Sequence, residues 1–567
     1  MAKKLKTIFS EFRIPNSEFI QNPKAKKLAS VFAILCVIGM FFGGYLLVVS
    51  LLFGGRLNTF WPVLSDEADY FLTVKRITQY GIVNGGGYNG YYANGEFSVA
   101  GTLNYGGHGF LGILPYIPIF LMGGTGFPMA IVSHLILMTI AFTAVYFLTN
   151  SLKKTIAVQA ASLAFMPFLL YFGSFMMEVQ QFALALIMAA VYYRWIITPP
   201  TRENSQLNSG SMNEMPTRPF LRMHKNRSII LSKKRDLALE SALIILIFLS
   251  CVTRISNLVF FIPYVAEKSR RGNKPILRAA VMSGIILVCC YAIYYINGLF
   301  TAPYTSGFLY TLANSMSNGG ITGFMRCFGY HFMRSLYDFF VPFYANPIFI
   351  LMRYLLVFLF VFFTVRGFFY YDKQKEKLIP RKKKDTLSIS FAAMIFGIAA
   401  LVAGLYDMFE WRDFRTFAPF VLFFVVYLLI SSRLKSIKAA ICVMIIFSML
   451  PHTPLMRTPY AADRWNKDPR PSPFAQELQF DENAENPWGN TVLTNLGGST
   501  DTGVWLKSDC RFGWIIAMDE IDGSSDLRCG YILIKGDLRE DFNGYELIKR
   551  AENMHLYKRM DNNERTL

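Results

Sequence analysis

The feature that most constrains this chain is a series of long apolar segments separated by short polar stretches. The first occupies residues 29–53. An α-helix needs roughly 20 mostly apolar residues to cross a bilayer, where every backbone polar group must be satisfied within the helix. The series predicts a mainly α, polytopic membrane protein with about 11 transmembrane helices. The further apolar segments are 127–149, 155–173, 179–197, 237–253, 256–267, 276–297, 347–365, 387–405, 416–431 and 437–450.

Composition and charge agree with a bilayer as the solvent. Hydrophobic residues make up 53% of the chain and charged residues 17%, a balance that would aggregate in water. The net charge is +19, and its basic residues gather in short loops between the apolar segments. The positive-inside rule places such loops on the cytoplasmic face, next to anionic lipids. The charge therefore indicates topology, and we find no nucleic-acid-binding module.

Two segments decide how often the chain crosses the membrane. The stretch 110–122 is short and contains Pro115 and Pro118, so we expect a re-entrant or interfacial segment. One helix over 237–267 would bury Arg254 in the bilayer, at a cost of at least a few kcal/mol without a partner. We therefore predict two short helices that turn at Arg254. Every basic cluster then falls on one side.

This topology divides the chain into three parts in the plasma (inner) membrane. Residues 1–28 form a basic cytoplasmic N-terminus, and residues 29–450 form the transmembrane domain with a first outer loop at 54–126. Residues 451–567 begin with a proline-rich polar stretch and form a small extracytoplasmic α/β domain. Within it we predict strands at 491–493, 513–516 and 531–534, and a helix at 545–551.

The first outer loop opens on a cluster of acids. Ser65 can cap a helix whose first turn contains Asp66, Glu67 and Asp69, followed by Tyr70. On such a helix Asp66 and Asp69 share one face, and Glu67 and Tyr70 share another. First-turn acids commonly do no more than stabilise a helix N-terminus. Their place at the bilayer surface, however, would let a base meet a membrane-bound donor.

The segment Asp66-Glu67-Ala68-Asp69-Tyr70 resembles the D-E-x-x-Y motif in the first outer loop of the GT-C glycosyltransferases. This superfamily includes the protein O-mannosyltransferases and the lipid A aminoarabinose transferases. The resemblance implies transfer of a sugar from a polyprenyl-phosphate carrier on the outer face of the membrane, with inversion. It covers the organisation of residues 30–410, with identity only in a few short motifs.

Other residues extend the resemblance. A Gly/Tyr/Asn-rich loop that contains Tyr105 follows the motif, and His108 stands where the aminoarabinose transferases have a lysine. Glu178 lies at the outer start of a segment where relatives carry a second functional acid. Arg254 resembles the arginine of the family's outer turn between paired helices. The resemblance places Tyr70, Tyr105, His108 and Arg254 at the substrate.

The proposed chemistry needs a carboxylate to take the proton of the acceptor hydroxyl and a cation to offset charge on the departing phosphate. Asp66 is the best candidate for the base, and Glu67 and Glu178 would orient the acceptor or the loop. Candidates for the phosphate site are Arg254, His108 and a charged turn. That turn contains Glu410, Arg412 and Arg415, and a local ion-pair turn is an equally good interpretation of it.

Three questions stay open at the level of sequence. The carboxylates of Asp66, Glu67 and Glu178 are hard oxygen ligands that could hold Mg²⁺ or Mn²⁺, but their spacing in the sequence does not require a metal. The acceptor can be a glycan, a lipid or a protein. A transporter or flippase of lipid-linked glycans and a non-catalytic membrane protein are the alternative functions, and a transporter should show ionisable residues deep in several spans.

A second charged patch lies on the outer side and is most simply interpreted as a solvated helix within a loop. Its residues are Arg326, His331, Arg334 and Asp338.

Overall fold

The computed structural model describes most of the helical part and a portion of the C-terminal part. Within residues 54–111 only short pieces are described, namely 67, 70–71, 73–74, 77–78, 91–93 and 96–98. The other described residues are 23–53, 112–123, 128–197, 219–270, 274–299, 307–340, 347–372, 376–381, 384–405, 412–431, 473–474, 476–479, 489, 491–496, 514–517, 529–540 and 542–560.

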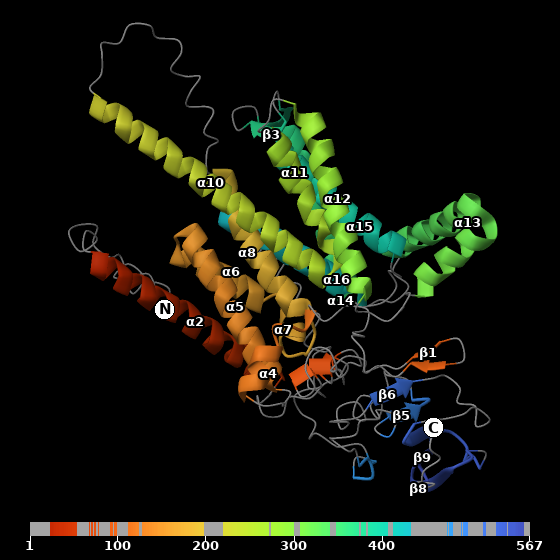
Figure 1. The fold of residues 1–567 in the computed structure, drawn as a ribbon. Coiled ribbons are helices and arrows are strands. Elements are labelled where there is room, and N and C mark those ends of the chain that lie inside the picture. Colours follow the sequence, from red (N-terminus) through yellow and green to blue (C-terminus); the bar gives the residue numbers. More distant parts are fainter. Residues whose placement is uncertain are drawn as a thin grey trace.

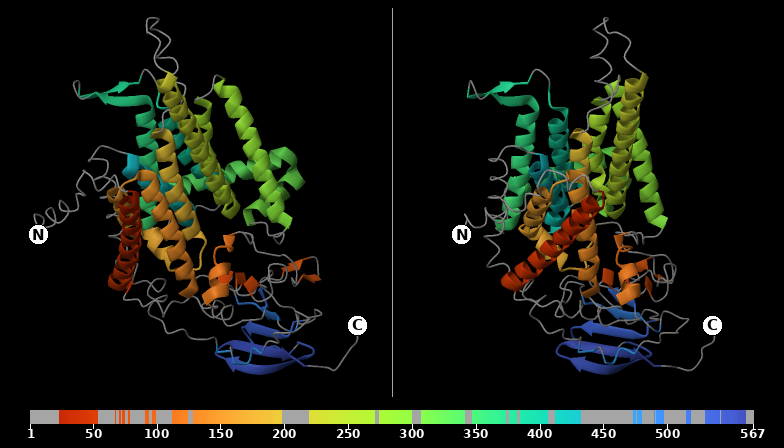
Figure 2. Two further views of the ribbon diagram at one scale, coloured as in Figure 1. Left: turned by 60° about the vertical axis from the view of Figure 1, so that its left-hand side comes forward. Right: turned by 90° about the vertical axis from the view of Figure 1, so that its left-hand side faces the viewer.

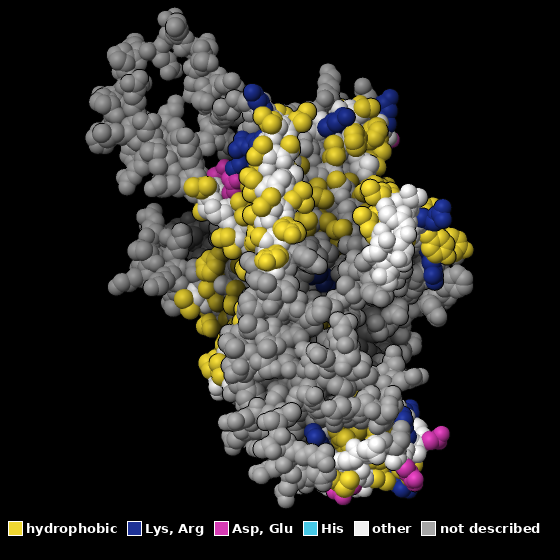
Figure 3. Space-filling model, turned by 45° about the vertical axis from the view of Figure 1, so that its right-hand side comes forward, with side chains coloured by type: hydrophobic (Ala, Val, Ile, Leu, Met, Phe, Trp, Pro, Cys, Tyr) yellow, Lys and Arg dark blue, Asp and Glu magenta, His cyan; other side chains and the backbone are white. Residues whose placement is uncertain are grey.

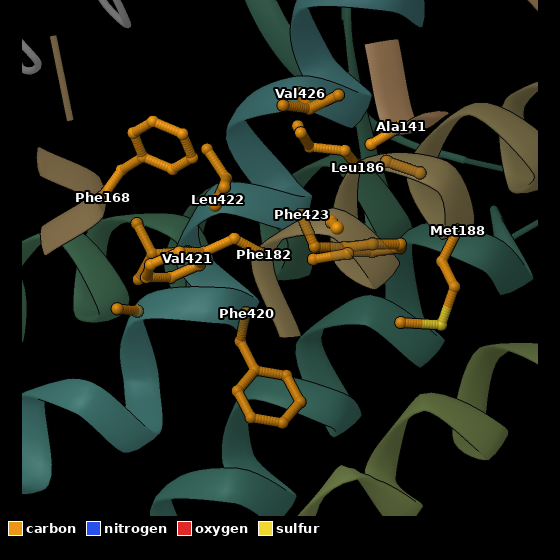
Figure 4. Packing of buried hydrophobic residues seen from close by; sticks show 14 of the residues in the cluster. Ala141, Phe168, Phe182, Leu186, Met188, Phe420, Val421, Leu422, Phe423 and Val426 are labelled. Carbon is orange, nitrogen blue, oxygen red and sulfur yellow. The ribbon is translucent and has the colours of Figure 1, made fainter. Parts of the chain in front are cut away.

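Two buried helices form the centre of the helical part. Helix α8 (Glu178–Ile197) and helix α16 (Arg412–Ser431) pack against each other, and their described side chains are buried almost all round. A helix that is apolar on every side belongs in a core. Phe182 and Leu186 of α8 belong to the same buried hydrophobic cluster as Phe420, Val421 and Phe423 of α16 (Figure 4).

The other long helices surround this pair (Figure 1). Helices α5 and α10 contact α8, and α2 packs against α5 and α6. A second group forms around α15, which contacts α11, α13 and α14. The bounds are α2 (Pro23–Phe53), α4 (Ile117–Gly123), α5 (Pro128–Thr149), α6 (Leu152–Leu163), α7 (Met166–Phe172), α10 (Pro219–Thr253), α11 (Phe261–Arg270), α12 (Pro275–Leu299), α13 (Gly307–Phe340), α14 (Pro347–Phe368) and α15 (Thr386–Leu405).

The outer helices expose apolar side chains that only a bilayer can cover. Within the part of the chain that the structure describes, three helices are long and apolar enough to cross a membrane: Met129–Thr149, Glu178–Ile196 and Asp236–Thr253. Shorter apolar stretches occur within α2, α12, α14, α15 and α16. Figure 3 shows hydrophobic side chains over much of the described helical surface and basic side chains at its upper end. Exposed apolar patches of this extent mark a membrane contact.

Basic residues of the described helices gather at one end of the bundle. Lys154 donates to the Tyr193 hydroxyl across 2.8 Å, which joins the start of α6 to the end of α8. Lys268 of α11 forms an ion pair with Glu240 of α10. Arg366 and Asp385 join the end of α14 to the start of α15. The clusters that the charge pattern places on one side of the membrane therefore do share one end.

The predicted turn at Arg254 is confirmed. Helix α10 ends at Thr253, Arg254 is extended (φ −158°, ψ 119°), and a 3-10 turn η4 (Ile255–Phe260) leads into α11. The Asn257 side chain donates to the Ser250 carbonyl across 2.9 Å and holds the turn closed. Because the chain reverses direction at Arg254, this arginine lies at the end of a helix and not in the middle of the bilayer.

Other predicted segments differ from the structure. The predicted span 155–173 is two short helices, because α6 ends at Leu163 and Pro167 stands at the start of α7. The stretch between the predicted spans 276–297 and 347–365, which carries the second charged outer patch, contains the long helix α13. Helix α4 has 7 residues, which agrees with a segment at 110–122 that does not cross. The predicted span 437–450 lies outside the described residues.

A five-stranded sheet forms the C-terminal part, below the helices in Figure 2. Its order is β6-β5-β7-β9-β8, where β5 is parallel to β6 and β7 and the other pairs are antiparallel. Apolar clusters cover both faces of the sheet. The strands of the sheet are β5 (Thr491–Thr494), β6 (Trp514–Ala517), β7 (Tyr531–Lys535), β8 (Tyr545–Ala551) and β9 (Met554–Arg559). Two hairpins lie elsewhere in the chain: β1 (Tyr91–Ala93) with β2 (Glu96–Ser98), and β3 (Phe369–Asp372) with β4 (Lys377–Pro380).

The predicted strands at 491–493, 513–516 and 531–534 are present as β5, β6 and β7. The predicted helix at 545–551 is wrong, because these residues form strand β8. Glu, Leu, Lys, Arg and Ala favour a helix, but a turn with Glu552 at φ 54° pairs β8 with β9. Pairing along the sheet edge outweighs the local preference.

Candidate functional site

The turn between α7 and α8, residues 173–177, is buried although it has no regular secondary structure. A buried turn exposes backbone N–H and C=O groups that water cannot reach, so side chains must satisfy them. The polar groups around this turn come from three segments that are distant in sequence. The turn leads directly into Glu178, the first residue of α8.

Three side chains bind the backbone of this turn and its flank. The Glu67 carboxylate is 0% exposed and accepts a hydrogen bond from the Phe175 N–H across 2.9 Å. His134 of α5 places Nδ1 2.8 Å from the Phe172 carbonyl oxygen. The Tyr116 hydroxyl lies 3.0 Å from the Met176 carbonyl oxygen. The first outer loop and α5 are thus fastened to the residues that precede Glu178.

Tyr116 and His134 also bind each other. The Tyr116 oxygen lies 2.7 Å from His134 Nε2. Because the Phe172 carbonyl can only accept, Nδ1 of His134 carries a proton. The single Tyr116 proton has two neighbouring acceptors, Nε2 of a neutral His134 ring and the Met176 carbonyl, and can be donated to only one of them at a time. Burial raises the pKa of the Tyr116 phenol above its usual value, and the carboxylates of Glu178 and Glu67 raise it further. The hydroxyl therefore remains a donor beside both acids.

The first outer loop approaches α8 closely at Gly112. Its carbonyl accepts from Gln180 Nε2 across 2.6 Å. A Cβ at this position would lie 2.0 Å from the sulfur of Met177, so any larger residue would have to displace the end of the Met177 side chain. The ring of Phe175 stacks on Tyr116 at 4.4 Å and contacts Phe71 edge-on at 5.6 Å. Both ends of the described loop therefore pack on the same turn.

Glu178 forms the second half of the site through an ion pair. Arg254 Nη2 lies 3.1 Å from Glu178 Oε1, and Arg254 Nη1 donates to the Thr416 hydroxyl across 3.2 Å. The side chains of Arg254 and Glu178 are 10% and 2% exposed. An acid at a helix N-terminus is stabilised by the helix dipole as well as by its partner. A buried charge pair of this kind depends on both members.

The site lies at the opposite end of α8 from the basic residues. Glu178 begins α8, and the Tyr193 that binds Lys154 is close to its end. At 1.5 Å per residue these positions are separated by roughly 22 Å. Glu67, Glu178 and Arg254 thus lie at one end of the helices, whereas the buried acids Glu240 and Glu267 lie at the other end, paired with Lys268 and Arg270.

The structure brings together Glu67, Glu178 and Arg254, which the sequence predicts at the site. Tyr70 is buried one helical turn after Glu67. Arg412 and Arg415 begin α16, directly before the Thr416 that binds Arg254. The remaining predicted residues lie outside the described residues; they are Asp66, Tyr105, His108 and Glu410.

Sequence reasoning missed Tyr116, His134 and Gln180. One signal was present, because His134 is an ionisable residue in a predicted span, where such residues usually have a specific partner. The partners of Tyr116 and Gln180 depend on contacts between segments about 60 residues or more apart, as with Tyr116 and Met176. Among the described residues, no three His, Cys, Asp or Glu side chains are grouped to hold a metal ion.

The Tyr116 hydroxyl is expected to stabilise the protein. Tyr116→Phe removes the donor and leaves His134 Nε2 buried without it, which should cost about 1–3 kcal/mol. His134→Phe should cost a similar amount, and the double variant should cost less than the sum of the two. Thermal unfolding in detergent measures all three. Tyr354→Phe, at an exposed tyrosine, is the matched control, and equal melting temperatures for Tyr116→Phe and the wild type would refute the interaction.

The helices with their apolar surfaces and the small sheet region are those of a polytopic membrane protein. No protein-family model and no curated protein matches the chain. Among solved structures the chain is similar to the crystal structure of ArnT from Cupriavidus metallidurans bound to undecaprenyl phosphate. The sequences are 11% identical, the match covers 92% of this chain and 98% of that chain, and the TM-score is 0.39.

A likeness of this degree extends to the broad arrangement of elements at most. The functional assignment therefore depends on the residues of this chain and on the contacts that they make.

Proposed function

We propose that the chain is an inverting glycosyltransferase that moves a sugar from a polyprenyl-phosphate carrier to an acceptor hydroxyl on the outer face of the membrane. One observation carries the proposal: Glu67, Glu178 and Arg254 meet around one buried turn at the end of the apolar helices opposite the basic residues. Acids and an arginine at one end of a membrane bundle provide the two functions that this transfer requires.

In the proposed reaction the acceptor oxygen attacks the anomeric carbon of the sugar. Asp66 takes the proton of the acceptor hydroxyl as the new C–O bond forms. The bond between the anomeric carbon and the phosphate oxygen breaks, and the carrier leaves as its phosphate with the bonding electron pair. Arg254 offsets the charge on this phosphate, since a guanidinium can bind Glu178 and a phosphate oxygen with different N–H groups.

Glu67 has a positioning role in this mechanism. Its carboxylate is fully buried and binds the Phe175 N–H, so it fixes the start of the motif helix against the turn. We therefore assign Glu67 to positioning and Asp66, the adjacent residue in the sequence, to proton transfer. The transition state resembles an oxocarbenium ion, so a carboxylate held nearby also stabilises its positive charge.

Mass spectrometry of surface glycans, glycolipids and carrier lipids tests the proposal in cells with and without the chain. We expect the acceptor to lack one sugar residue when the chain is absent, and the carrier-linked sugar to accumulate on the outer face. A carrier-linked sugar that accumulates only on the cytoplasmic face would instead indicate a flippase. Identical acceptor masses in both cells would contradict glycosyl transfer. Undecaprenyl phosphate, the lipid bound in the ArnT crystal structure, is the carrier to examine first.

A further inference from the structure

Helix α13 is unlike the other long helices in its direction and in its surface. It is interrupted at Gly320 (φ 55°, ψ −153°), a conformation that side chains other than glycine's rarely adopt. It lies across the direction of the neighbouring helices rather than along it (Figures 1 and 2). It packs against α15. The proposed glycosyl transfer uses none of its residues.

The half of α13 after Gly320 has a distinct inner face. Phe324, Phe328 and Phe332 stack in a row, with ring centroids 6.1 and 6.2 Å apart. Ser335, the next position on the same side, is fully buried. The spacing of four and three residues is that of one helical stripe. This stripe holds the segment against the protein and fixes which side of the helix faces outward.

The outer face combines two arginines with apolar and aromatic side chains. Arg326, Tyr330 and Arg334 follow each other at intervals of four residues, and all three are exposed. Met333 and Tyr337 are exposed in the adjoining row. Figure 3 shows basic side chains on either side of hydrophobic ones at the right edge of the helical part. We call residues 326, 330, 333, 334 and 337 the α13 outer face.

Neither water nor hydrocarbon suits this surface. In water the methionine and the tyrosine rings would remain exposed without cover. In the hydrocarbon core each arginine would cost at least a few kcal/mol. The headgroup layer suits both kinds of side chain, because it solvates the arginines and also covers apolar and aromatic groups. Helices that lie in this interface typically combine tyrosines, arginines and apolar residues.

We propose that the α13 outer face lies in the headgroup layer and binds the phosphate of an anionic bilayer phospholipid. Arg326 and Arg334 are separated by about 12 Å along the helix axis. Their long side chains can therefore reach one phosphate group above Tyr330 or two adjacent phosphate groups. Guanidinium groups bind phosphate oxygens through paired N–H donors, and the Tyr330 hydroxyl can add a further hydrogen bond. Met333 and Tyr337 would cover the acyl chains just below.

Depth measurements in lipid nanodiscs test the placement. A fluorescent amino acid replaces Tyr330, which is 71% exposed, or Val288 near the middle of α12, which is 70% exposed. We expect lipids brominated near the headgroup to quench position 330 most strongly, and lipids brominated deep in the chain to quench position 288. Position 330 without quenching by either lipid would indicate a water-facing helix and overturn the proposal. Preferential quenching of position 330 by the deep label would overturn it equally.

Lipid retention tests the recognition. Native mass spectrometry compares the phosphatidylglycerol bound to the purified full chain and to the variant Arg326→Gln/Arg334→Gln. We expect about tenfold weaker retention in this variant, since basic residues near anionic lipid each add a substantial share of the attraction. The variant Lys535→Gln/Arg550→Gln removes two exposed charges of the C-terminal sheet and should change little. Equal retention by both variants would overturn a specific site, even if the depth result holds.

Discussion

Asp66→Asn is expected to reduce sugar transfer by roughly a thousandfold while the protein still inserts and folds. The amide cannot take the proton of the acceptor hydroxyl, and it has nearly the same shape as the carboxylate. Purified protein is incubated with undecaprenyl-phosphate-linked sugar, and the release of the lipid phosphate is measured over time. Unchanged release by this variant would remove Asp66 from the mechanism and leave another acid as the base.

Two control variants separate this effect from damage to the loop. Asp69→Asn changes the acid three residues later in the same motif, and we expect a much smaller loss of activity. Glu67→Gln keeps an oxygen that can accept from the Phe175 N–H, whereas Glu67→Ala does not. We therefore expect Glu67→Gln to retain more activity and a higher melting temperature than Glu67→Ala. A Glu67→Ala variant as stable as Glu67→Gln would contradict the anchoring role.

Features of this fold that depend on the bilayer could be predicted from the sequence. The turn at Arg254 follows from the cost of a buried charge, and the gathering of Lys154 and Lys268 at one end follows from the distribution of charge along the chain. The cost of burying a charge and the placement of basic residues act on each segment separately. They can therefore be inferred from the sequence without knowing which segments contact each other.

Features that depend on contacts between distant segments could not be predicted in this way. Helix α13 occupies a stretch that is too polar and glycine-rich to indicate a span, and its place is set by packing against α15. Strand β8 has a sequence suited to a helix and is fixed by its pairing with β9. At the site, Glu67 could be singled out as an acid of a motif, but its partner Phe175 is 108 residues away. The motif gave no means of identifying the buried turn that joins them.

The ion pair between Arg254 and Glu178 is expected to be the most costly single contact to break. Arg254→Met leaves the Glu178 carboxylate buried without its cation, which should destabilise the protein by about 3–5 kcal/mol. The same change removes a donor from Thr416. Thermal unfolding of the variant in detergent or nanodiscs measures the loss.

A compensating variant identifies the origin of this loss. Arg254→Met/Glu178→Gln removes both charges, and we expect it to regain most of the stability, since a neutral pair avoids the uncompensated charge. Arg254→Lys keeps the charge but cannot bind Glu178 and Thr416 with one planar fork, so it should be intermediate. If the double variant were no more stable than Arg254→Met, packing of the arginine stem rather than its charge would hold α10 to α8. If it regained stability and still failed to release lipid phosphate, the pair would be required for transfer independently of the fold, as expected of an arginine that receives the carrier's phosphate.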